Sequence, residues 1–98
     1  MKIIVKNRAG TSIWDHPSSG DGAWLRYWMN QKGVYHPPIC ECCKRSLAEV
    51  GGHVIKVNSS DKDVYIAPLC RACNNRSPKD PYVVESSMLV SAASSRLR

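Results

Sequence analysis

The chain has 98 residues and a formal net charge of +6, and 43% of its residues are hydrophobic. This length predicts one domain over residues 1–98, and the composition is typical of a globular chain rather than a disordered one. No apolar run reaches the length of a signal-peptide core or of a membrane-spanning helix, so we expect no membrane association. The five cysteines are an odd number, which disfavours a fully paired set of secreted disulfides and favours reduced thiols in the cytoplasm.

The N-terminal part of the chain predicts a strand and a helix. KIIVK over residues 2–6 is typical of a short strand, and the Gly-, Ser- and Pro-rich stretch after it predicts a loop. An amphipathic helix is expected over residues 21–33, because Asp21 is a suitable N-cap and Gly33 suits the position directly after the last turn.

Trp24, Leu25 and Trp28 would share one face of this helix. We expect them to pack as an apolar lid over the structure that the cysteines build. If exposed, the tryptophans would instead be suited to stacking on bases or, together with Trp14, to anchoring a protein partner.

The middle of the chain predicts a hairpin. Two consecutive prolines carry extended backbone into the first cysteines, after which residues 51–57 and 63–68 have the pattern of strands and NSSDK that of a turn. Pro68 is expected to halt the second strand, and a helix is expected to begin at Leu69 or Cys70.

The C-terminal part of the chain predicts one more strand. YVVESSMLV has the composition of a strand, and residues 91–98 are expected to form a frayed tail. Together these elements predict an α+β fold, in which an amphipathic helix and a short C-terminal strand flank a small core that the cysteines hold together.

Two C-x-x-C pairs give the strongest chemical signal in the sequence. Cys40 with Cys43 and Cys70 with Cys73 form the pattern C-x2-C-x26-C-x2-C. Zinc prefers four ligands in a tetrahedron, and a two-residue gap lets a turn or a helix start present two thiolates to the same ion. The pattern favours a structural Zn²⁺ site over buried thiols, disulfides or a redox pair, for which no βαβ context exists. Cys42 is the spare thiol, because its spacing is poorer for a ligand.

Residues 40–76 resemble the HNH endonuclease family, whose zinc core is a treble clef. A C-x-x-C pair, a histidine in GGHV and the segment YIAPLCRACN occur in the order of the family's zinc knuckle, β-hairpin and helix. The resemblance implies a treble-clef zinc core over residues 40–76, and it places His53 at the position of the family's general base.

The other catalytic positions of the family pattern are replaced in this chain. The acid before the histidine is Gly52, the central asparagine is Tyr65, and the histidine after the last cysteine is Asn74. A phosphodiester cut needs a divalent cation to stabilise the developing charge, and a glycine and a neutral amide offer little to hold it. We therefore expect a scaffold that has lost its nuclease groups, with His53 as a structural residue. The alternative keeps His53 as general base and Asn74 as a ligand of a second divalent cation.

Three functions are compatible with these observations. The first is a small, non-catalytic zinc-binding module that contacts DNA or RNA phosphates through basic residues near the cysteines, namely Lys44, Arg45, Arg71 and Arg76. The second is a divergent, metal-dependent endonuclease that uses His53 and Asn74. The third is a zinc-stiffened module that binds a protein partner through its tryptophans.

Overall fold

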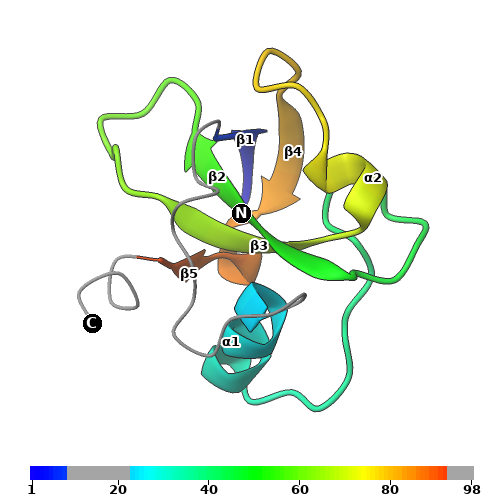
Figure 1. The fold of residues 1–98 in the computed structure, drawn as a ribbon. Helices are drawn as coiled ribbons and strands as arrows, with labels where there is room; N and C mark the ends of the chain where they lie inside the picture. Colours follow the sequence, from blue (N-terminus) through cyan, green and yellow to red (C-terminus); the bar gives the residue numbers. More distant parts are fainter. Residues whose placement is uncertain (9–22, 93–98) are drawn as a thin grey trace.

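The fold is α+β and is built around one antiparallel sheet (Figure 1). The computed structural model describes residues 1–8 and 23–92 of the chain. Within these ranges five strands lie in the order β4-β1-β2-β3-β5, and each neighbouring pair is antiparallel. The elements are, in chain order, β1 (Lys2–Asn7), α1 (Ala23–Lys32), β2 (Val50–Lys56), β3 (Tyr65–Leu69), α2 (Arg71–Asn74), β4 (Tyr82–Glu85), the 3₁₀ turn η1 (Ser86–Met88) and β5 (Val90–Ser91).

The N-terminal strand β1 lies inside the sheet, between β2 and β4. Val5 pairs with Lys56 of β2 on one side and with Tyr82 of β4 on the other. The alternation of KIIVKN turns Ile3, Val5 and Asn7 to one face of the sheet. Val5 and Asn7 are buried on that face. The predicted strand is therefore present and extends one residue further than expected.

The predicted hairpin is present as β2 and β3. Its strands pair from Val50 opposite Leu69 to Val54 opposite Tyr65. Pro68 does not halt the second strand as predicted, and it lies within β3. A proline is tolerated in a strand where its missing N–H is not needed, and the carbonyl of Pro68 accepts a hydrogen bond from the loop that carries the first cysteine pair.

An ionic contact closes the far end of the hairpin. Asp61 Oδ2 lies 3.0 Å from Lys56 Nζ and accepts a hydrogen bond from the Tyr65 hydroxyl. Lys56 Nζ also lies over the Tyr65 ring, 4.7 Å from its centroid. Hydrogen bonds from the Tyr65 hydroxyl and the Asp63 backbone N–H lower the pKa of Asp61 to about 2. This carboxylate is therefore occupied by contacts inside the hairpin.

Helix α1 ends at the predicted glycine. Gly33 has a φ of 67°, its N–H donates to Asn30 O at 3.3 Å, and the Val34 N–H donates to Met29 O at 3.1 Å. This pair of bonds is a Schellman motif, which a glycine in the left-handed region forms without strain. Asp21, the predicted N-cap, lies outside the described residues. In the described part of the chain, no helix combines the length and the apolar character that crossing a bilayer requires.

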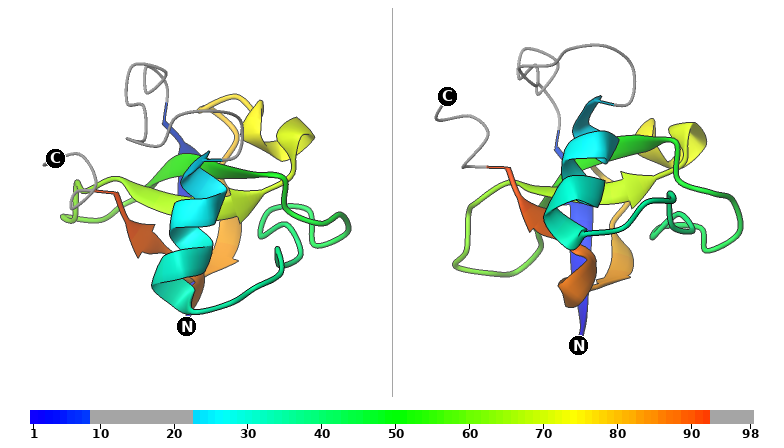
Figure 2. Two further views of the ribbon diagram at one scale, coloured as in Figure 1. Left: turned by 60° about the horizontal axis from the view of Figure 1, so that its bottom comes forward. Right: turned by 90° about the horizontal axis from the view of Figure 1, so that it is seen from below.

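The sheet separates two groups of buried side chains. On one face α1 lies across β2 and β3 (Figure 2), and Tyr27 and Trp28 pack there with Ile66. On the other face Val54 and Leu69 pack with buried cysteines from the loop after α1 and from the start of α2. The lid that the helix was predicted to form over the cysteines therefore covers the opposite side of the sheet.

Two glycines in β2 let α1 and α2 approach the sheet closely, one on each face. A Cβ atom on Gly51 would lie 2.7 Å from the backbone carbonyl carbon of Trp24 and 2.8 Å from the backbone nitrogen of Leu25. A Cβ atom on Gly52 would lie 2.6 Å from Asn74 Oδ1. Because successive residues of a strand face opposite sides of a sheet, the pair admits α1 on one side and α2 on the other.

The C-terminal part of the chain differs from its prediction. The single strand expected in YVVESSMLV is divided into β4, η1 and β5, and the two short strands lie at opposite edges of the sheet. The first two residues of the tail predicted over 91–98 belong to the fold, because Ser91 pairs with β3 and Ala92 is fully buried. The outer edge of β3 offers backbone hydrogen-bonding groups that these residues satisfy. Residues 93–98 lie outside the described residues.

Replacing Gly51 by alanine tests the close approach of α1. Gly51→Ala is expected to destabilise the fold by about 3 kcal/mol, because the new methyl group would press on the helix backbone rather than on a movable side chain. Gly33→Ala is the matched control, since nothing lies within 4 Å of a Cβ there and only the left-handed backbone opposes it, at about 1 kcal/mol. Denaturant unfolding followed by circular dichroism measures both. A Gly51→Ala variant as stable as Gly33→Ala would contradict the packing described.

Candidate metal centre

The first cysteine pair lies in a tight turn in the loop after α1. The backbone N–H of Cys40 donates to Ser46 O at 2.7 Å, and the Lys44 N–H donates back to Cys40 O at 3.0 Å. Lys44 has a φ of 62°, in the left-handed region that reverses the chain directly after the second cysteine. The turn thereby presents both sulfur atoms of the pair to one side.

The second cysteine pair opens helix α2. β3 ends at Leu69, and Cys70 follows as the N-cap residue in extended conformation, with φ −74° and ψ 162°. The Asn74 N–H donates to Cys70 O at 2.9 Å and closes the first turn. Cys73 lies three residues after Cys70, where a helix brings side chains to the same face. The end of the hairpin therefore places the second cysteine pair next to the first.

The four sulfur atoms converge. The Sγ atoms of Cys40, Cys43, Cys70 and Cys73 all lie within 4.8 Å of one another, and those of Cys43 and Cys70 are 4.0 Å apart. Four thiolates at about 2.3 Å from one tetrahedral zinc would be about 3.8 Å apart. The donor set and its spacing therefore fit a structural Zn²⁺ with its four positions filled. Among the described residues, no second group of three or more His, Cys, Asp or Glu side chains comes together in this way.

The surroundings act differently on the individual thiols. Backbone N–H groups of Ser46 and Arg45 lower the pKa of Cys43 to about 6, which favours its thiolate. Burial raises the pKa of Cys73, and neighbouring thiols raise it further. At Cys70 the backbone N–H of Cys73 lowers the pKa, but burial and a neighbouring thiol outweigh it, so the net shift is upward. Four crowded thiolates are unfavourable by themselves, and a divalent cation between them supplies the compensating charge.

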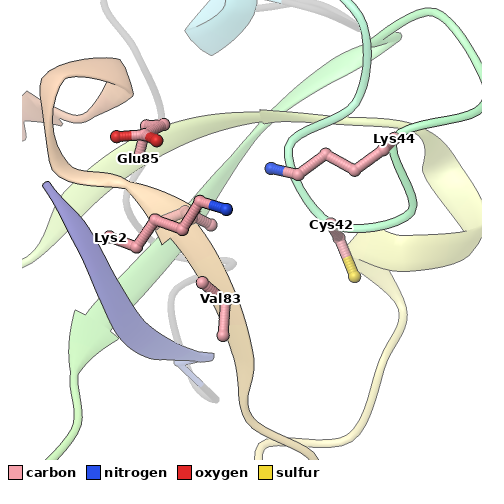
Figure 3. Close-up of a pocket in the computed structure, with 6 residues that line it drawn as sticks. Lys2, Cys42, Lys44, Val83 and Glu85 are labelled. Carbon is pink, nitrogen blue, oxygen red and sulfur yellow. The ribbon is translucent and has the colours of Figure 1, made fainter.

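Cys42 takes no position among the converging sulfurs. It is half-buried, and Figure 3 shows its sulfur at the wall of a surface pocket next to the turn. This position agrees with the prediction, made from the spacing of the cysteines, that Cys42 is the spare thiol.

A buried asparagine of β1 holds the end of α2. Asn7 is 6% exposed. Its Nδ2 donates to three backbone carbonyl oxygens, at 2.9, 3.2 and 3.0 Å, those of Cys73, Asn74 and Arg76. Its Oδ1 accepts a hydrogen bond from the Tyr82 hydroxyl at 2.6 Å. One side chain therefore satisfies carbonyl groups that the short helix leaves open at its end. Sequence reasoning missed Asn7, although the alternation of KIIVKN places it on the inward face.

A buried glutamate attaches the cysteine-bearing turn in a similar way. The backbone N–H of Glu41 donates to Pro68 O of β3 at 2.9 Å. Its Oε1 accepts hydrogen bonds from the backbone N–H of Glu85 in β4 and from Lys44 Nζ, each at 3.0 Å. Glu41 was also missed, because an acid between two cysteine ligands resembles an ordinary surface residue in the sequence.

The structure does not bring His53 and Asn74 together. His53 lies on the α1 side of the sheet, where its ring packs edge-on against Trp24 at 4.7 Å between centroids and its Nε2 atom is buried. Asn74 Oδ1 lies on the other side, next to Gly52. A Cβ at position 52 would come within 2.5 Å of the Leu69 side chain, so an acid does not fit there without displacement. These positions do not converge on a second cation.

The basic residues predicted to contact nucleic acid lie close to the converging cysteines along the chain. All four are exposed and lie within three positions of a converging cysteine: Lys44, Arg45, Arg71 and Arg76. Two of them are oriented by glutamates, since Lys44 Nζ lies 3.0 Å from Glu41 Oε1 and Arg71 Nε lies 4.0 Å from Glu49 Oε2.

The tryptophans of α1 belong to the interior. Trp28 is 2% exposed, and its Nε1 donates to Met88 O at 2.8 Å. Trp24 is half-buried and packs edge-on against Tyr27, with ring centroids 5.6 Å apart. Trp14 lies outside the described residues. A buried Trp28 offers no anchor to a protein partner, which removes one support of the protein-interaction hypothesis.

Replacing Asn7 by aspartate tests the attachment of α2. Asn7→Asp is expected to destabilise the fold by about 3 kcal/mol, because it places a carboxylate of the same size against three carbonyl oxygens in a buried position. Tyr82→Phe is the matched control, which removes only the hydrogen bond to Asn7 Oδ1 and should lose about 1 kcal/mol. Urea unfolding compares the two variants. If the aspartate variant lost no more stability than the phenylalanine variant, Asn7 would not hold the end of α2.

Comparison with known proteins does not assign this site. No protein-family model, curated protein or solved structure matches the chain at a significant level. The resemblance of residues 40–76 to the HNH family therefore depends on the residues of that segment alone.

Proposed function

We propose that this chain is a small zinc-binding module of treble-clef type, organised by one Zn²⁺ and without catalytic activity. The convergence of four cysteine sulfurs within 4.8 Å carries the proposal. Thiolates are soft ligands that select zinc over calcium or magnesium. Four protein ligands also leave no open position for a water or a substrate, so the metal is structural rather than catalytic.

The order of elements around the cluster supports the treble-clef type. The turn that carries the first cysteine pair is followed by the hairpin β2–β3, and the helix that carries the second pair follows the hairpin. The HNH resemblance implies this order. The surroundings are different, because α2 has only four residues and the hairpin belongs to a larger sheet.

The geometry around His53 supports a module without nuclease chemistry. A general base needs a positioned water, and phosphodiester cleavage needs a cation close to it. His53 instead packs against Trp24, and Asn74 lies across the sheet from it. Tyr65, at the position of the family's central asparagine, donates to Asp61 at the far end of the hairpin.

Zinc content and its removal test the metal assignment. Reduced, purified protein is expected to contain one zinc per chain by elemental analysis. A strong chelator is expected to unfold it, because a structural zinc contributes about 10 kcal/mol or more, which is comparable with the whole stability of a small domain. Circular dichroism in the near and far ultraviolet measures the loss of structure.

Two cysteine variants provide the control for this experiment. Cys70→Ser is expected to abolish stoichiometric zinc, whereas Cys42→Ser is expected to retain it, because Cys42 is not among the converging sulfurs. Equal zinc content in the two variants, or spectra that chelation leaves unchanged, would overturn the proposal.

We further propose that the cysteine-bearing end of the module contacts nucleic-acid phosphates. The net charge is +6, and exposed basic side chains flank both cysteine pairs, namely Lys44, Arg45, Arg71 and Arg76. Lysine and arginine bind phosphates without regard to sequence, and each contact releases condensed counterions. Binding of this kind is therefore weakened by salt and differs little between sequences.

Fluorescence anisotropy with labelled DNA and RNA tests this part of the proposal. Affinity is expected to fall steeply with salt, and a variant with both Arg45→Glu and Arg71→Glu should bind at least about tenfold more weakly. Lys62→Glu, at the far end of the hairpin, reverses a charge away from the cluster and should have a smaller effect. The absence of binding at low salt would exclude nucleic acid as the partner.

A cleavage assay tests the nuclease alternative. With Mg²⁺ or Mn²⁺ present the strands should stay intact, and cleavage that His53→Ala abolishes would establish the nuclease alternative instead.

A further inference from the structure

A pocket of about 350 Å³ lies between the cysteine-bearing turn and the strands β1 and β4. This volume lies within the range of small-molecule sites. The pocket is distinct from the metal centre, because none of the four converging cysteines lines it. Its lining combines three chain segments (Figure 3): Lys2 of β1, Cys42 and Lys44 of the turn, and Val83, Val84 and Glu85 of β4.

Two ammonium groups face each other across this pocket. Figure 3 shows Lys2 and Lys44 extending from opposite walls, with their nitrogen atoms directed toward the gap between them. Lys44 is held in this direction by the carbonyl oxygen of Glu41 at 2.7 Å and by its carboxylate at 3.0 Å. Lys2 forms no ion pair with any residue in the ranges 1–8 and 23–92. The Glu41 carboxylate balances part of the charge of Lys44, and an anion in the gap would lie between this ion pair and the ammonium group of Lys2.

We propose that this pocket binds the phosphate group of a phosphate monoester, between Lys2 and Lys44. An ammonium group is a compact charge that suits phosphate oxygens, whereas planar carboxylates are matched better by the fork of arginine. Two cations from two segments also match the double charge of a monoester. Val83 is 48% exposed and offers an apolar surface to the organic part of the ligand.

Two carboxylates limit the affinity of the pocket, and one of them is that of Glu41, whose Oε1 lies 3.0 Å from Lys44 Nζ. Glu85 contributes a carboxylate to the same lining, and Figure 3 shows it beside Lys2 rather than in the gap between the two ammonium groups. An anion in the gap is therefore attracted by both lysines and repelled by both carboxylates. Removing the charge of Glu85 is expected to strengthen binding.

The pocket shares Lys44 with the nucleic-acid contacts proposed above, whereas Lys2 belongs to the pocket alone. A monoester reaches it either as a free nucleotide or as the 5′-phosphate of a strand, and these two sources share the same chemistry. Arg45 and Arg71 do not line the pocket. A variant in which both are glutamate should therefore leave the binding of a mononucleotide unchanged while it weakens the binding of long strands.

Amide shifts in NMR spectra of the zinc-loaded full chain test the pocket. The probes are inorganic phosphate, adenosine monophosphate, and one oligonucleotide with and without a 5′-phosphate. Saturable shifts are expected at Lys2, Cys42 and Val83. Lys2→Gln should weaken mononucleotide binding about tenfold, since a hydrogen bond to a charged group is lost. Glu85→Gln should strengthen it, and Lys62→Gln, far from the pocket, should not change it.

The results distinguish a free nucleotide from the 5′-phosphate of a strand, and they also show whether the proposal is wrong. Binding of the mononucleotide supports a free ligand, and binding of only the 5′-phosphorylated strand supports a strand end. Equal shifts with the unphosphorylated strand, an affinity that Lys2→Gln leaves unchanged, or no saturable shift with any probe would overturn the proposal.

Discussion

Four thiols held within 4.8 Å of one another form the constraint on which the structure depends. Burial raises the pKa of Cys73, while backbone N–H groups lower that of Cys43 to about 6. The surroundings thus favour the thiolate at Cys43 and oppose it at Cys73, and a divalent cation between the sulfurs would stabilise all four thiolates. Because the sulfurs come from segments far apart in sequence, such an ion would link the loop after α1 to the end of the hairpin.

The sheet determines how these two segments meet. Asn7 and Glu41 are the buried polar side chains of the described residues, and both connect a cysteine-bearing segment to a strand. Asn7 holds the carbonyl end of α2, and Glu41 joins the turn to β3 and β4. A domain of this size buries a modest apolar core. Buried polar groups whose hydrogen bonds are formed then help to specify one arrangement of these segments over others.

The same sheet separates the residues that a nuclease would need to bring together. Gly52 and His53 are neighbours in sequence, but successive residues of a strand face opposite sides. His53 meets Trp24 on one side, and the position of Gly52 is filled by Leu69 and Asn74 on the other. The glycine pair is thus explained by the close packing of two layers. A binding role is compatible with this geometry, and the phosphate contacts proposed above would use the exposed basic residues next to the cysteine pairs and the pocket lined by Lys2 and Lys44.

Local patterns in the sequence determined most of the elements and the set of cysteines that come together. The alternation of KIIVKN, the Gly33 end of α1, the hairpin and the two C-x-x-C pairs each follow from rules that act over a few residues, and the structure contains all of them. The tertiary structure alone decided that β1 lies between β2 and β4, that α1 covers the face opposite the cysteines, and that the last strand is divided between two edges of the sheet. It also decided the contacts of Asn7 and Glu41 and the position of Lys2 in the pocket lining. The hydrogen bonds of Asn7 and Glu41 join residues up to 75 positions apart or depend on which strands become neighbours, and no local pattern encodes such a pairing, because it results from the packing of the chain.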